Sequence, residues 1–130
     1  MESILSRLLA DTPQTRHILK LLFIGLILAG LVSALMPLYG IDLNNGKDKI
    51  VHALVFCGFA FLLDIASSRS FWFWKVPLLL FYGGSIEILQ ALTPWRSLSI
   101  TDFVADATGI LLYWLLWKKL LQRYLPHTNS

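Results

Sequence analysis

The fold is decided by residues 21–41, which read LLFIGLILAGLVSALMPLYGI and contain no charged side chain. The hydrocarbon core of a bilayer is about 30 Å thick, and a helix needs about 20 mostly apolar residues to cross it. The stretch is therefore predicted to span a membrane. Val32-Ser33-Ala34 has the small residues of a signal-peptide cleavage site. Because the apolar run exceeds the roughly 7–15 residues of a signal core, we favour a retained helix.

The composition of the whole chain supports a membrane protein. Of its 130 residues, 56% are hydrophobic and 15% are charged, with a net charge of +3 and a mean hydropathy of +0.65. A soluble domain is about a quarter charged, because a small sphere needs many polar residues on its surface. The composition therefore argues against a soluble domain, a disordered chain and a nucleic-acid-binding arm. The lone Cys57 excludes an internal disulfide.

Three further stretches have the length of membrane spans, and their ionisable side chains lie near the ends, where charge is least costly. The short connections leave no room for a second domain. We predict an all-α fold, an integral membrane bundle of four transmembrane helices within a single domain, residues 1–130. The predicted spans are about 21–41, 50–66, 71–92 and 102–117.

The basic residues predict the orientation of these spans. One side of the membrane receives eight of them, Arg7, Arg16, Lys20, Arg69, Lys75, Lys118, Lys119 and Arg123. The other side receives Lys47, Lys49 and Arg96. Because cytoplasmic loops carry the excess of Lys and Arg, we expect a multi-pass protein with both termini in the cytoplasm. At the cytoplasmic end, Asp64 and Arg69 flank a turn, and we expect them to pair loosely.

The polar side chains of the outer half gather at one depth. They are Lys49, His52, Glu87, Gln90, Arg96, Asp102 and Asp106. Within each span their spacing is three or four residues, so each set shares one helix face. Gly109 continues the face of Asp102 and Asp106, and it would let another helix backbone approach closely. We predict that these side chains form a ligand-binding cluster.

A structural explanation competes with this prediction. Ser99-x-x-Asp102 resembles a capping box, and carboxylates at a helix start match the helix dipole. The cluster would then be only an interhelical salt-bridge network. Other residues contradict their own helix dipoles, because Glu87 lies near a C-terminal end and Lys49 lies in a first turn. Such residues are expected to pair across helices or to meet a ligand.

The order and spacing of these residues resemble a known family. Asp48-Lys49-x-x-His52, Glu87-x-x-Gln90, Pro94-x-Arg96-x-x-Ser99, Asp102 and Gly109 are similar to the VanZ-like family, named for a teicoplanin-resistance protein. The resemblance covers roughly residues 20–118. It implies a short protein of the bacterial inner membrane that belongs to the cell envelope and is linked to glycopeptide tolerance. The family usually has Asn at the position of Asp106.

Three functions follow from these observations. The leading one is binding or modulating an envelope component, with partners among the bilayer, an envelope lipid, a lipid-linked sugar or a glycopeptide, and no nucleic acid. The second is an intramembrane enzyme that acts on an envelope lipid or lipid-linked sugar by His/carboxylate acid–base chemistry. The third is a structural membrane subunit. We predict no cofactor and find no metal-ligand spacing, although two acids and a histidine could hold a divalent cation. The sequence leaves the ligand and the oligomeric state open.

Overall fold

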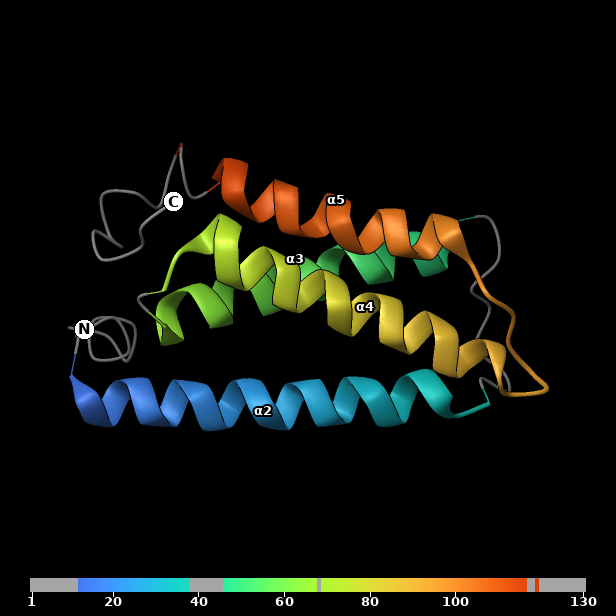
Figure 1. The fold of residues 1–130 in the computed structure, drawn as a ribbon, viewed down its shortest axis with the longest axis horizontal. Helices are drawn as coiled ribbons and strands as arrows, with labels where there is room; N and C mark the ends of the chain where they lie inside the picture. The colour runs from blue at the N-terminus through green and yellow to red at the C-terminus, as the bar shows by residue number, and fades with distance from the viewer. Residues whose placement is uncertain (1–11, 38–45, 68, 117–118, 120–130) are drawn as a thin grey trace.

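The computed structural model describes residues 12–37, 46–67, 69–116 and 119. The described chain forms the helices α2 (Pro13–Leu35), α3 (Lys47–Ala66), α4 (Val76–Ala91) and α5 (Ile100–Leu116), with a π-helical turn, η1 (Phe71–Lys75), directly before α4. The helices lie side by side along the long axis of the molecule, and successive helices run in opposite directions (Figure 1). The predicted all-α class is confirmed for the described residues, which contain no strand.

The first helix lies earlier in the chain than the predicted 21–41. Its start is fixed by Thr12, whose side-chain oxygen accepts a hydrogen bond from the Thr15 N–H at 3.2 Å, and by Pro13 at the first helical position. It ends at Leu35 because Met36 precedes Pro37 and is extended, with φ −78° and ψ 145°. Residues 38–41 of this predicted span, residue 117 of the last one and both chain termini lie outside the described residues.

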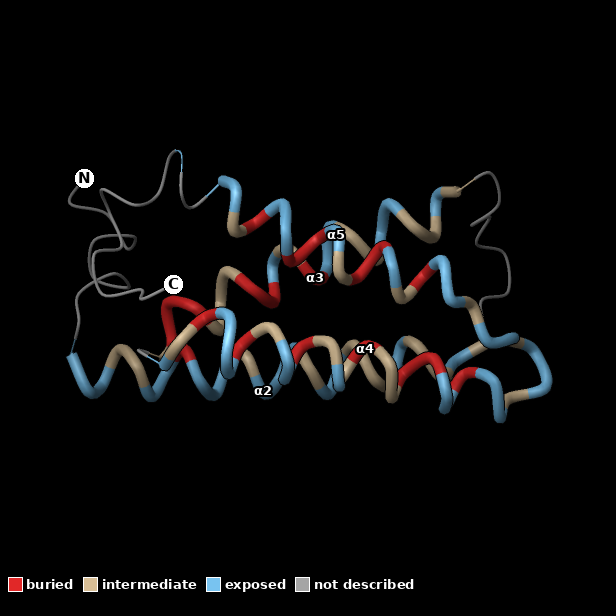
Figure 2. The backbone as a smooth tube through the Cα atoms, turned by 45° about the horizontal axis from the view of Figure 1, so that its top comes forward, coloured by how far each residue is buried: buried red, intermediate tan, exposed pale blue. Residues whose placement is uncertain are grey.

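Two helices, α2 and α3, are long and apolar enough to cross a membrane. The outer surface of the bundle is apolar as well. Exposed fractions reach 83% for Phe73, 77% for Leu92 and 76% for Phe81. Exposed residues follow the outer side of the helices (Figure 2), and α2 buries only Leu19. A soluble monomer rarely shows apolar patches of this extent.

The interior is held together by aromatic packing and by one close helix contact. Phe56 and Phe59 of α3 meet edge to face with ring centroids 5.5 Å apart, and Tyr113 of α5 packs on Phe61 at 6.0 Å. Gly109 faces α3, where an added Cβ would overlap the carbonyl oxygen of Ala53 and lie 2.9 Å from its carbonyl carbon. A hydrogen atom at this position therefore lets α5 approach the backbone of α3.

Candidate functional site

Polar side chains from three helices meet at one end of the bundle. They come from the N-terminal turns of α3 and α5 and from the last turns of α4, and we call them the open cluster: Lys49, His52, Glu87, Asp102 and Asp106. Lys49 Nζ lies 3.4 Å from Asp102 Oδ1 and 3.5 Å from Asp48 Oδ2. Lys49, whose positive charge is unfavourable near the N-terminus of α3, is thus paired with an acid on α5.

His52 is oriented by a buried carboxylate. Its Nδ1 lies 2.7 Å from Oδ1 of Asp106, which is buried. An imidazole N–H donates to a carboxylate at this distance. The other ring nitrogen, Nε2, faces Asp102 and lies 3.9 Å from its Oδ2. Asp106 therefore fixes the ring so that Nε2 points into the cluster.

Glu87 caps a helix that is not its own. Ser99 Oγ accepts from the Asp102 N–H at 3.2 Å, which is the first half of the predicted capping box. The second half comes from α4, because Glu87 Oε2 accepts from the Ser99 N–H at 3.1 Å. The carboxylate thus lies at the positive end of the α5 dipole. This exchange frees the Asp102 carboxylate to face Lys49 and His52.

Two carboxylate oxygens in the open cluster are buried without a partner among the described residues. They are Glu87 Oε1 and Asp106 Oδ2. One ligand atom each from His52, Glu87 and Asp102 lie within 4.8 Å of one another, close enough to be drawn around one metal ion. All three residues belong to the predicted cluster, but spacing along the chain does not indicate that their ligand atoms meet at one point, because each residue comes from a different helix.

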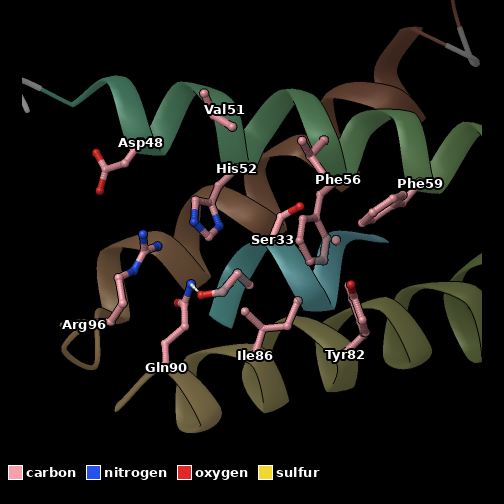
Figure 3. A pocket seen from close by; sticks show the side chains of 13 residues that line it. Ser33, Asp48, Val51, His52, Phe56, Phe59, Tyr82, Ile86, Gln90 and Arg96 are labelled. Atoms are coloured by element: carbon pink, nitrogen blue, oxygen red, sulfur yellow. Dashed lines mark hydrogen bonds between the residues drawn. The ribbon is translucent and has the colours of Figure 1, made fainter. Parts of the chain in front are cut away.

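The two remaining predicted residues lie beside the open cluster. Gln90 is buried and its Nε2 donates to the carbonyl oxygen of Ala34 at 3.0 Å, which ties α4 to α2. Arg96 lies in the connection before α5, and no acid of the described residues pairs with it. Asp48, His52, Gln90 and Arg96 surround one end of a pocket (Figure 3).

That pocket lies between α2, α3 and α4 and has a volume of about 280 Å³. Away from the polar end its walls are almost entirely apolar, as Figure 3 shows, and include Val55, Phe56, Phe59 and Ile86. The contribution of α2 to the lining includes Ser33. The cavity is thus polar at one end and apolar along its length.

A second buried polar cluster lies at the opposite end of the bundle, and we call Asp64, Lys75 and Tyr113 the closed cluster. Lys75 Nζ donates to Asp64 Oδ1 at 2.6 Å and to the Asp64 carbonyl oxygen at 3.2 Å. The Tyr113 hydroxyl donates to Asp64 Oδ2 at 2.5 Å. The expected pairing of Asp64 with Arg69 is therefore wrong, because Lys75, whose buried charge needs a counter-ion, takes the carboxylate. Arg69 instead lies over the Trp74 ring, 4.7 Å from its centroid.

Comparison with known proteins gives one match. The VanZ/LLP1 family model matches residues 10–122, which include every residue of both clusters and of the pocket. No curated protein and no solved structure matches the chain. The matched segment covers far more than half of the sequence and agrees with the resemblance carried by its polar motifs. This chain belongs to the VanZ/LLP1 family.

Proposed function

We propose that this protein spans the bacterial inner membrane four times, with both termini in the cytoplasm, and binds an amphipathic component of the cell envelope in its pocket. The apolar outer surface supports insertion in a bilayer. The excess of Lys and Arg at one end supports the orientation, even with Lys75 withdrawn into the closed cluster.

The helix α2 supports a retained first span rather than a cleaved signal. It accepts hydrogen bonds from α4 at two depths, through Ile27 from Tyr82 at 2.7 Å and through Ala34 from Gln90 at 3.0 Å. It also forms one wall of the pocket. Cleavage at the Val32-Ser33-Ala34 motif would remove most of α2 and, with it, this wall of the pocket. The bundle is therefore complete only when α2 is retained.

The shape and lining of the pocket carry the proposal. A hydrocarbon chain fits the apolar walls formed by Val55, Phe56 and Ile86, whereas a polar head group fits the end near His52 and Arg96. Ligand sites are typically apolar with a few placed polar groups. A purely structural bundle would not need a cavity of about 280 Å³ at this place.

The head group is expected to be anionic. Arg96 lies at the polar end of the pocket and is not neutralised by an acid of the described residues. A guanidinium group binds phosphate or carboxylate oxygens in a planar, two-pronged geometry. An envelope phospholipid and a phosphate-linked carrier of sugars share this chemistry, so the experiment must separate them.

The test measures lipid binding to the full chain in detergent by native mass spectrometry, with phosphatidylglycerol, undecaprenyl phosphate and phosphatidylcholine as separate probes. We expect one of the two anionic lipids to bind more tightly than phosphatidylcholine. Arg96→Ala should weaken that binding by about tenfold, the value of a charge-assisted hydrogen bond. Arg69→Ala, which removes an arginine at the far end of the bundle, serves as the control. Equal binding of all three lipids by Arg96→Ala and the parent protein would reject the proposal.

The same pair of variants tests the link to glycopeptide tolerance. The family name supports such a link, and the pocket supplies a place for an envelope component to bind. In a bacterium that lacks the gene, expression of the parent protein and of Arg69→Ala should raise teicoplanin tolerance. Expression of Arg96→Ala should not.

A further inference from the structure

The open cluster has more negative than positive side chains. Asp102, Asp106 and Glu87 are joined by Asp48 at the edge. Lys49 pairs with Asp48 and Asp102, and the His52 ring pairs with Asp106 and faces Asp102. Lys49 is shared between Asp48 and Asp102, so it neutralises neither completely. Carboxylates this close together repel one another unless a cation lies among them. The cluster therefore has room for additional positive charge.

The orientation of His52 suits a metal ligand. A histidine that binds a metal commonly donates its other ring N–H to a carboxylate, which fixes the tautomer and the direction of the free nitrogen. His52 has this arrangement, with Nδ1 held by Asp106 and Nε2 facing Asp102. The lone pair of a neutral imidazole is then on Nε2, inside the cluster.

Glu87 gives an independent indication of a missing partner. Its side chain is only 3% exposed, and its Oε2 is occupied by the Ser99 N–H. Its Oε1 is buried and has no partner among the described residues. A buried carboxylate oxygen without a partner is costly, because the charge has lost its water. The helix cap holds the carboxylate in place, so the side chain cannot simply turn away.

From these observations we infer that His52, Glu87 and Asp102 form a binding site for one divalent transition-metal ion, Zn²⁺ or Mn²⁺. Their ligand atoms lie within 4.8 Å of one another. A tetrahedral ion with bonds of about 2.1 Å needs ligand atoms about 3.4 Å apart, so side-chain movements of about an ångström complete the site. One imidazole with two carboxylates favours Zn²⁺ or Mn²⁺ over Mg²⁺ and Ca²⁺, which prefer oxygen ligands alone.

The neighbours of the site are compatible with such an ion. Asp102 binds Lys49 through Oδ1, which leaves Oδ2 facing His52. Hydrogen-bonded carboxylates of this kind are common as metal ligands. Three protein ligands leave one tetrahedral position for water or for a ligand atom. His52 also lines the pocket, so the ion would lie behind the polar end of that cavity.

The experiment measures metal binding by the full chain, purified in detergent with a tag that contains no histidine and freed of metal with a chelator. Isothermal titration with ZnCl₂ and with MnCl₂ is expected to show one site per chain that MgCl₂ does not occupy. Glu87→Gln should weaken this site by roughly 100-fold. The amide oxygen can still accept the Ser99 N–H, so this variant should fold. Asp48→Asn removes a neighbouring acid that is not one of the three ligands, so it should weaken the site far less, by about threefold at most.

Thermal unfolding provides the second measurement and checks the fold of each variant. Zn²⁺ or Mn²⁺ should raise the unfolding temperature of the parent protein and of Asp48→Asn but not that of Glu87→Gln. Binding at His17 or at the chain ends would be equal in all variants and would not follow this pattern. The inference is overturned if the parent protein binds neither ion, or if folded Glu87→Gln binds as tightly as the parent. Neither result depends on lipid binding, so this test can fail while the proposed pocket function stands.

Discussion

The two ends of the bundle bury the same kinds of side chain in opposite states. In the closed cluster, each oxygen of the Asp64 carboxylate has a donor, one from Lys75 and one from Tyr113. One acid meets one base, and both are 2% exposed. In the open cluster, several acids share Lys49 and His52, and Glu87 Oε1 has no partner among the described residues.

The difference supports a structural role for the closed cluster and agrees with the binding role proposed for the open cluster. A buried ion pair is tolerable when hydrogen bonds satisfy it completely, and the closed cluster meets this condition without any ligand. The open cluster does not, and it adjoins a pocket through His52. By burial and charge alone, the two clusters are alike. Counting the partners of each polar atom tells them apart.

The largest effect is expected from breaking the closed cluster. Lys75→Met removes the base and leaves the Asp64 carboxylate buried with only the Tyr113 hydroxyl. The uncompensated charge should lower the free energy of unfolding by about 3–5 kcal/mol. Thermal and denaturant unfolding of the purified protein in detergent would measure the loss.

Two variants sharpen this result. Arg69→Ala changes a nearby base that lies over Trp74 and should alter stability by less than about 0.5 kcal/mol. The double variant Asp64→Asn with Lys75→Met removes both charges and should recover part of the loss. If Lys75→Met alone unfolds like the parent protein, the closed cluster is not a stabilising element.

An intermediate effect is expected at Gly109, which lies on α5 between the residues that α5 gives to the two clusters. Gly109→Ala places a Cβ against the carbonyl group of Ala53 and should push α3 and α5 apart. Overpacking of this kind costs about 1–3 kcal/mol. Unfolding of the purified variant would measure the loss.

Gly58→Ala is the matched control for this change. No atom lies within 4 Å of a Cβ at position 58. Alanine is a better helix former than glycine, so this variant should gain about 0.5–1 kcal/mol. A stabilising Gly109→Ala would contradict the close approach of α3 and α5.

The all-helical class could be predicted because long apolar runs form few structures other than helices. The residues at which the helices begin and end were harder to predict. The end of α2 depends on Pro37, which follows an extended Met36, inside an apolar run that composition alone extends to residue 41. The π-helical turn Phe71–Lys75 leaves no periodic pattern in the sequence. The extra residue in this turn allows both Phe71 and Lys75 to be buried, which the sequence alone does not indicate.

For the candidate site, the depth of the polar residues could be predicted from the sequence, but their partners could not. Dipole arguments indicated that Glu87 and Lys49 act across helices, and both do so in the structure. Which acid meets which base depends on the rotation of each helix about its axis, which spacing does not fix. For the same reason the predicted pair of Asp64 with Arg69 is wrong: Lys75, inside an apolar span, has the greater need of a buried acid.

Among the buried polar residues, the smallest effect on stability is expected in the open cluster, where Glu87→Gln should change the free energy of unfolding by less than about 1 kcal/mol in the absence of metal. The amide oxygen can still accept the Ser99 hydrogen bond. The substitution also removes one negative charge from the open cluster, in which acids outnumber bases. Removing that repulsion offsets the loss of the favourable dipole interaction at the start of α5.

The matched change in the closed cluster is Asp64→Asn, an equally isosteric swap of acid for amide. It should be strongly destabilising, because charged Lys75 then stays buried without its counter-ion. Unfolding of both variants under identical conditions would measure the contrast. Equal destabilisation would mean that the acids of the open cluster are balanced as completely as Asp64 is, and that no cation is needed among them. A neutral Glu87→Gln beside a damaging Asp64→Asn would show that the Glu87 carboxylate does not stabilise the fold, as expected of a residue kept for binding rather than for folding.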